Sequence, residues 1–118
     1  MNPIEIDVLG TTYTVYELAP EDESTLEEGV LGTTDWTTHE IMLRGSIKEP
    51  TGSNSLANLD VLYKETLRHE ITHAFLFESG MTGSDSFEGD FAHNELMVDW
   101  FAMQAPKLFK AFEEAGAL

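Results

Sequence analysis

The segment LRHEITHAFLFESG, residues 67–80, sets two histidines and a glutamate among apolar residues. His69, Glu70 and His73 have the spacing H-E-x-x-H. On a helix, residues four apart differ by about 40° around the axis and by roughly 6 Å along it, so both imidazoles can face one ion. Glu70 lies about 100° from His69, where it can reach a water beside that ion but is badly placed as a ligand. This spacing predicts a zinc site with a general base next to it.

A catalytic zinc site has three protein ligands and one position for water, so the third ligand must come from outside this helix. We choose Glu95, because the segment NELMVD places Glu95 and Asp99 four residues apart on one face of a following helix. Asp99 would accept a hydrogen bond from the free N–H of a histidine and fix its tautomer. His93 would point about 200° away from Glu95 on a helix and is retained only as a backup ligand.

The chemistry expected of this set is zinc-assisted hydrolysis of an amide. Zinc with one carboxylate ligand keeps positive charge, which polarises a carbonyl and lowers the pKa of water. Glu70 would take the proton from that water and return it to the leaving amine. The residue that stabilises the oxyanion is left open: His39 and Tyr63 are considered, but ordinary structural roles are favoured for both.

The composition indicates one folded domain, residues 1–118. The chain has 42% hydrophobic residues, no cysteine and a net charge of −16. Its first 43 residues contain ten acidic residues and no lysine or arginine, which disfavours nucleic-acid and anionic-membrane partners. Without disulfides, a signal peptide or an apolar run long enough to span a membrane, the expected compartment is the cytoplasm.

The elements that must position the site are strands first and helices afterwards, an α+β arrangement with the helices on one side of a small sheet. Alternating and β-branched residues predict a hairpin over 4–18, with strands at 4–10 and 12–18, and a second strand pair at 30–35 and 38–44. Residues 19–28 are left as a loop or a short helical turn, and 45–58 read as a connecting loop.

Helical periodicity runs from Leu59 to Ser79, with Gly80 as the residue that closes the helix. A loop at 81–89 precedes a second helix, expected to begin at an Asp90 cap. Pro106 is expected to end or kink that helix and to start a last one, closed by Gly116. The aromatic residues of this region are predicted to belong to the core rather than to a binding surface: Trp100, Phe101, Phe109 and Phe112.

The segments HEITHAFL and ELMVDWFAMQAP together resemble the ImmA/IrrE-type metallopeptidases and, more widely, the gluzincins. The match covers His69, Glu70 and His73, then Glu95, Asp99, Phe101, Ala102 and Pro106. The resemblance implies a zincin-like minimal fold, in which the edge strand of a small sheet receives an extended peptide or protein substrate. THEIMLR, residues 38–44, would be that strand. Compact members of the family often occur as bacteriophage and prophage products, and this chain resembles one.

The sequence leaves a second hypothesis from another class. The zinc site could be structural, and the acidic surface could be the functional part, in a phage protein that binds a host protein or imitates nucleic acid. Glu70 argues against this alternative, because a structural site needs no general base and is usually closed by a fourth ligand. The oligomeric state is not predicted.

Overall fold

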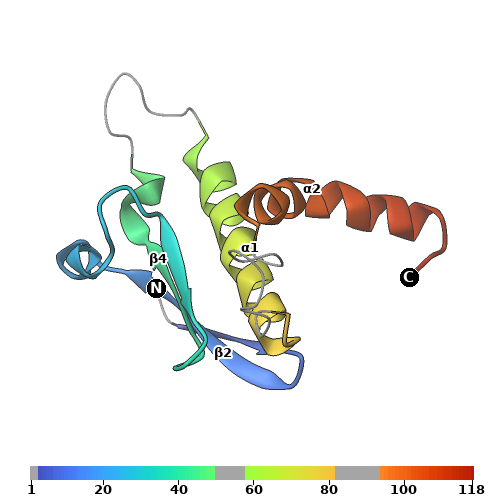
Figure 1. Ribbon diagram of the computed structural model, residues 1–118. Coiled ribbons are helices and arrows are strands. Elements are labelled where there is room, and N and C mark those ends of the chain that lie inside the picture. The colour runs from blue at the N-terminus through green and yellow to red at the C-terminus, as the bar shows by residue number, and fades with distance from the viewer. Residues whose placement is uncertain (1–2, 50–57, 82–93) are drawn as a thin grey trace.

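The computed structural model describes residues 3–49, 58–81 and 94–118. Over these residues the chain forms an α+β structure of four strands, two short 3-10 helices and two long helices, as the sequence predicts (Figure 1). The strands are β1 (Ile4–Val8), β2 (Thr11–Leu18), β3 (Gly32–Asp35) and β4 (Glu40–Arg44). The long helices are α1 (Leu59–Glu78) and α2 (Glu95–Glu114).

The first two strands form the predicted hairpin. Val8 pairs with Thr11, which leaves Leu9 and Gly10 as a two-residue loop, and both have positive φ, 51° and 90°. Two residues of positive φ are typical of the type I′ turn, whose twist matches that of the flanking strands. Residues 20–25 then form a 3-10 helix that begins at Pro20, the second of the two structures that the sequence left open.

The sheet has the order β1-β2-β4-β3. The second strand pair, β3 and β4, is antiparallel, while β2 and β4 run parallel. β4 therefore lies inside the sheet, and the assignment of residues 38–44 to the edge is wrong. The two edge strands of the described sheet are β1 and β3, and β3 contacts α1 through the hydrogen bond from Thr34 to Glu70. A short alternating segment such as THEIMLR fits an interior and an edge strand equally well.

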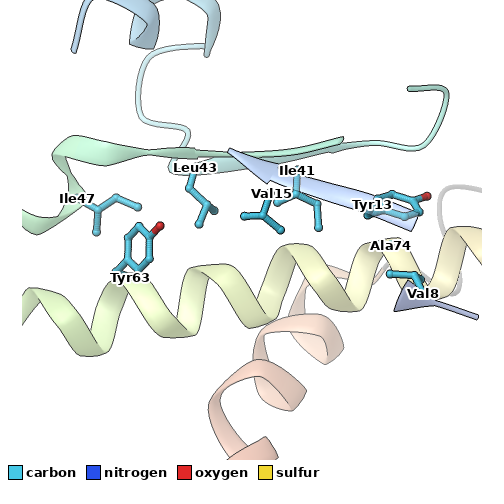
Figure 2. Packing of buried hydrophobic residues seen from close by; sticks show 8 residues of the cluster. All are labelled: Val8, Tyr13, Val15, Ile41, Leu43, Ile47, Tyr63 and Ala74. Atoms are coloured by element: carbon cyan, nitrogen blue, oxygen red, sulfur yellow. The ribbon is translucent and has the colours of Figure 1, made fainter. Parts of the chain in front are cut away.

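The core lies between the sheet and α1 (Figure 2). Ile41 and Leu43 of β4 and Tyr13 and Val15 of β2 point at the helix and are almost fully buried. This is the alternation expected for a sheet with one covered face. On the helix side, Tyr63 and Ala74 are buried against these strands. The position of α1 relative to the sheet is thus fixed by apolar packing.

The second helix begins later than predicted. Asn94 is its N-cap, with Oδ1 accepting hydrogen bonds from the backbone N–H groups of Leu96 and Met97. The expected start at Asp90 is therefore wrong; Asp90, His93 and most of the expected loop at 81–89 lie outside the described residues. The helix continues through Pro106 to Glu114, so the separate last helix is also wrong, although Gly116 with φ 69° does follow its end.

The four aromatic residues of α2 are not in the core. Trp100, Phe101, Phe109 and Phe112 are 44–58% exposed, whereas Val98, Ala102 and Ala105 are buried. The prediction failed because small residues, not the large ones, form the buried stripe on this helix. In Figure 1, α2 crosses α1 on the side away from the sheet, and its C-terminal part extends beyond the rest of the described chain. No helix in the described ranges is long and apolar enough to cross a membrane.

Candidate metal centre

The helix α1 carries His69, Glu70 and His73 in its second half. Asn58 caps its N-terminus by accepting a hydrogen bond from Val61 N at 3.2 Å, and Gly80 follows its end with φ 83°. Such a glycine is the usual residue at this position, because it adopts positive φ without a Cβ penalty. The two imidazole rings lie one turn apart, with their centroids 4.9 Å from each other. The predicted pairing of the two histidines on one face is therefore present.

Glu95, in the first turn of α2, reaches both imidazoles. Its Oε2 lies 3.1 Å from His69 Nε2, and its Oε1 lies 2.9 Å from His73 Nε2. The Asn94 cap sets where the helix begins and so which residue faces α1 at this point. Two segments separated by 22 residues in the sequence thus bring three side chains to one place, as the sequence predicts.

Asp99, one turn further along α2, holds the other side of His69. Its Oδ1 lies 2.6 Å from His69 Nδ1. A carboxylate can only accept, so Nδ1 carries the proton and Nε2 of a neutral ring has a free lone pair. That lone pair then faces the Glu95 carboxylate. Two acceptors so close together need a positive charge, either a second proton on the ring or a cation between them.

The donor set fits a zinc ion. Nitrogen from histidine and oxygen from glutamate are among zinc's usual ligands, at about 2.0–2.2 Å, and two such ligands of a tetrahedral site are roughly 3.3 Å apart. Each imidazole Nε2 has one oxygen of Glu95 near that separation, Oε2 at 3.1 Å for His69 and Oε1 at 2.9 Å for His73. One donor atom from each of the three side chains can be chosen so that all lie within 4.8 Å of one another. No other group of this kind was found among the described residues.

Glu70 is placed beside these residues and outside the group. It is only 6% exposed, and its Oε2 lies 3.9 Å from His69 Nε2. Its Oε1 accepts a hydrogen bond of 2.8 Å from the hydroxyl of Thr34 in β3, which orients the carboxylate. Burial raises the pKa of Glu70, although the Thr34 hydrogen bond opposes the shift. Nothing in the sequence singles out Thr34, because its role depends on how β3 lies against α1.

Gly32 allows β3 to approach Glu70. A Cβ at this position would lie 2.9 Å from Leu43 Cδ2 and 3.1 Å from Glu70 Cγ, so any side chain would require a shift of its neighbours. A cavity of about 280 Å³ opens at this point, with Gly32 in its wall and with His69, Glu70 and Asp99 at one end. The candidate base therefore faces a space next to the candidate metal ligands.

Arg68 links α1 to α2 through a proline. Pro106 has no N–H, so the carbonyl of Ala102 lacks the donor that a helix normally supplies four residues on. The Nε of Arg68 donates a hydrogen bond to this carbonyl, and Ala102 is fully buried. This contact explains how α2 continues through Pro106. The proline alone could have indicated an unpaired carbonyl at residue 102, but not the donor.

The other two residues considered in the sequence do not lie at the candidate metal ligands. His39 has its ring 5.2 Å from that of Tyr13, and Tyr63 is 7% exposed in the core with the Lys48 ammonium 4.2 Å from its ring centroid. Neither lines the cavity. The structure therefore does not bring either residue to the candidate site.

Comparisons with known proteins add no relative. No family model, no curated protein and no solved structure matches the chain.

Proposed function

We propose that the chain is a zinc-dependent metalloendopeptidase of the ImmA/IrrE type, a minimal zincin-like domain that hydrolyses peptide bonds. The observation that supports this most is the bridging position of Glu95 between two imidazole nitrogens, with Asp99 on the far nitrogen of His69. His69, His73 and Glu95 would hold the metal. Three carboxylates around two imidazoles favour a bound cation electrostatically.

A zinc ion at this place would supply Lewis-acid chemistry, polarising a peptide carbonyl and making a water more acidic. Glu70 would act as general base and general acid. Its Oε2 accepts a proton from the attacking water and then gives that proton to the nitrogen of the leaving amine. Thr34 holds the other oxygen and thereby limits the rotation of the carboxylate. Asp99 keeps the proton of His69 on Nδ1.

The strand β3 is the proposed site for the substrate backbone. It lies at the edge of the described sheet, beside α1, and its Thr34 contacts Glu70. An extended peptide could pair with the free side of this strand by strand addition and so pass over the metal ligands. β3 therefore takes the place that the sequence analysis had given to residues 38–44.

The variant Glu70→Gln tests this proposal. Chain purified after dialysis should contain about one zinc per molecule, in the wild type and in the variant, because Glu70 is not a ligand. Cleavage of a peptide library, followed by mass spectrometry, should fall by at least about a hundredfold in the variant because the proton transfers are lost. Asp60→Asn, an equal change at an exposed position of the same helix, serves as the control.

Full cleavage by Glu70→Gln would remove Glu70 from the mechanism. A second outcome is a chain that binds zinc but cleaves no peptide, and that binds a partner protein in a salt-sensitive way. The variant Glu70→Gln would then bind the partner equally well. That result would favour the acidic binding protein with a structural zinc site.

A further inference from the structure

The cavity beside the metal centre has a second end, away from the ligands, that the proposed mechanism does not use. There it is lined by Leu62, Glu65 and Thr66 of α1 and by Leu31, just before β3. Its volume of about 280 Å³ is at the lower limit of ligand pockets, roughly 300 Å³, and suits one side chain rather than a larger molecule. We propose that this cavity is the subsite for a lysine or arginine side chain next to the scissile bond, with Glu65 as its charge partner. This inference rests on the proposed function.

The polar groups at this end of the cavity can only accept hydrogen bonds from a ligand. Glu65 is a half-buried carboxylate, and no cation or donor contacts it among the residues that the structure describes. The hydroxyl of Thr66 donates its proton to the carbonyl of Leu62 at 2.8 Å, so only its lone pairs remain. Lysine and arginine head groups only donate. The two sets of groups are complementary.

The distances along α1 also suit a long basic side chain. Glu65 lies one turn before His69, on the same side of the helix and about 6 Å away along the axis. A side chain that starts at the scissile bond and runs along the helix would place its aliphatic stem on Leu31 and Leu62 and its charge at Glu65. Basic residues commonly bury their stems on apolar surface in this way. An uncharged methionine or leucine would fill the same space but would leave the carboxylate unpaired.

The first test compares cleavage of peptides that differ at one residue. The zinc-loaded full chain is given alanine-based hexapeptides with lysine, arginine, methionine or glutamate on either side of the central bond. The wild type should cleave the lysine or arginine peptide with a kcat/KM about tenfold above that for methionine, the scale expected for a hydrogen-bonded charge pair. Glu65→Gln should bring this ratio close to one. Asp60→Asn, which removes the same charge from α1 outside the cavity, should leave the ratio unchanged.

Charge reversal provides an independent result. Glu65→Lys should prefer the glutamate peptide over the lysine peptide, since the sign of the cavity is inverted while its stem-binding walls remain. Circular dichroism and zinc content report whether each variant is folded and loaded. An unchanged lysine-to-methionine ratio in folded, zinc-loaded Glu65→Gln would overturn the proposed subsite.

Binding without turnover separates this inference from the proposed function. The same peptides are titrated calorimetrically into zinc-loaded Glu70→Gln and into the double variant that also has Glu65→Gln. The subsite is supported if Glu70→Gln binds the lysine peptide more tightly than the other peptides and the double variant does not. This holds even if the wild type cleaves no peptide, and in that case only the proposed peptidase activity is overturned. Cleavage without any preference overturns the subsite alone. If none of the peptides binds, the subsite is also overturned.

Discussion

The two long faces of α1 are held by different kinds of contact. Towards the sheet, Tyr63 and Ala74 pack against buried strand residues in a continuous apolar core. Towards α2, the helix makes its specific contacts through polar atoms, with His69 and His73 against carboxylates and Arg68 against a backbone carbonyl. A narrow stripe of small buried residues, including Val98 and Ala102, accompanies them.

The difference shows what each face contributes to the site. Apolar packing is not directional and does not depend on ions, so the sheet face fixes α1 as a rigid support for its histidines. Hydrogen bonds and ion pairs depend on protonation and on bound cations. The positions of Glu95 and Asp99 on the α2 face should therefore depend on the pH and on whether a cation is bound. We therefore expect substitutions on the sheet face to cause the largest losses of stability. Substitutions on the α2 face should mainly change how stability depends on the metal.

The largest effect is expected on the sheet face. Ile41 is fully buried there, and Ile41→Ala should lower the free energy of unfolding by about 3 kcal/mol, since it removes apolar contacts and leaves a cavity. Urea denaturation with and without zinc measures this loss. The loss should be the same in both conditions. A loss that depends on zinc would show that the two faces are coupled, contrary to the comparison.

On the α2 face, adding or removing zinc should have the next largest effect if the proposed site binds it. Zinc at a free concentration about a hundredfold above its Kd should stabilise the wild type by about 2.7 kcal/mol, and a chelator should reverse this. Glu95→Gln should weaken zinc binding and so reduce the increase in Tm. Its stability without metal should change little, because the Glu95 side chain is 65% exposed. An equal zinc-induced increase in Tm in wild type and Glu95→Gln would exclude Glu95 as a ligand.

The contact between Arg68 and the Ala102 carbonyl should have an intermediate effect. Arg68→Met keeps an aliphatic stem but leaves a buried carbonyl unpaired, at a cost of about 1–2 kcal/mol in urea denaturation without metal. Pro106→Ala restores an N–H that can bond to this carbonyl within the helix. In that background, Arg68→Met should cost about 1 kcal/mol less, a coupling within the range of interacting pairs. Lys64→Met, at an exposed position of α1, is the control.

The contrary result is that Arg68→Met causes the same loss of unfolding free energy with alanine and with proline at position 106. That result would contradict the proposed role of Arg68 as the hydrogen-bond donor to the Ala102 carbonyl. The interface would then depend on the stem of Arg68 and on the small residues, not on the carbonyl.

Much of the fold and most of the candidate site follow from local patterns in the sequence. The strand alternation around Ile41, the helical period of α1 and the i, i+4 spacing of His69–His73 and of Glu95–Asp99 all act over a few residues. These patterns correctly predicted the α+β class and the meeting of the two histidines with Glu95.

The errors concern relations between elements. β4 lies inside the sheet because it pairs in parallel with β2, whose residues lie some 26 positions earlier in the sequence. The residues of β4 alone do not indicate this pairing. The aromatic residues of α2 have a helical period that is typical of a buried face, yet α2 packs through Ala102 and its small neighbours. Thr34 and Arg68 became visible only when two elements were placed side by side.

The smallest effect is expected at the polar end of the sheet face, where Tyr13 donates a hydrogen bond of 2.7 Å to Glu78 Oε2. This bond is the main reason why the pKa of Glu78 is lowered from its ordinary value of 4.5. A carboxylate with a lowered folded-state pKa adds stability above its ordinary pKa and loses it as the pH falls through the lowered value. Wild-type stability should therefore fall more steeply than that of Tyr13→Phe as the pH drops from about 6 to about 3. Urea denaturation at a series of pH values measures both slopes, with Tyr16→Phe on the same strand as the control. If Tyr13→Phe is as pH-dependent as the wild type, the hydrogen bond from Tyr13 to Glu78 adds no proton-dependent stability to this face of α1.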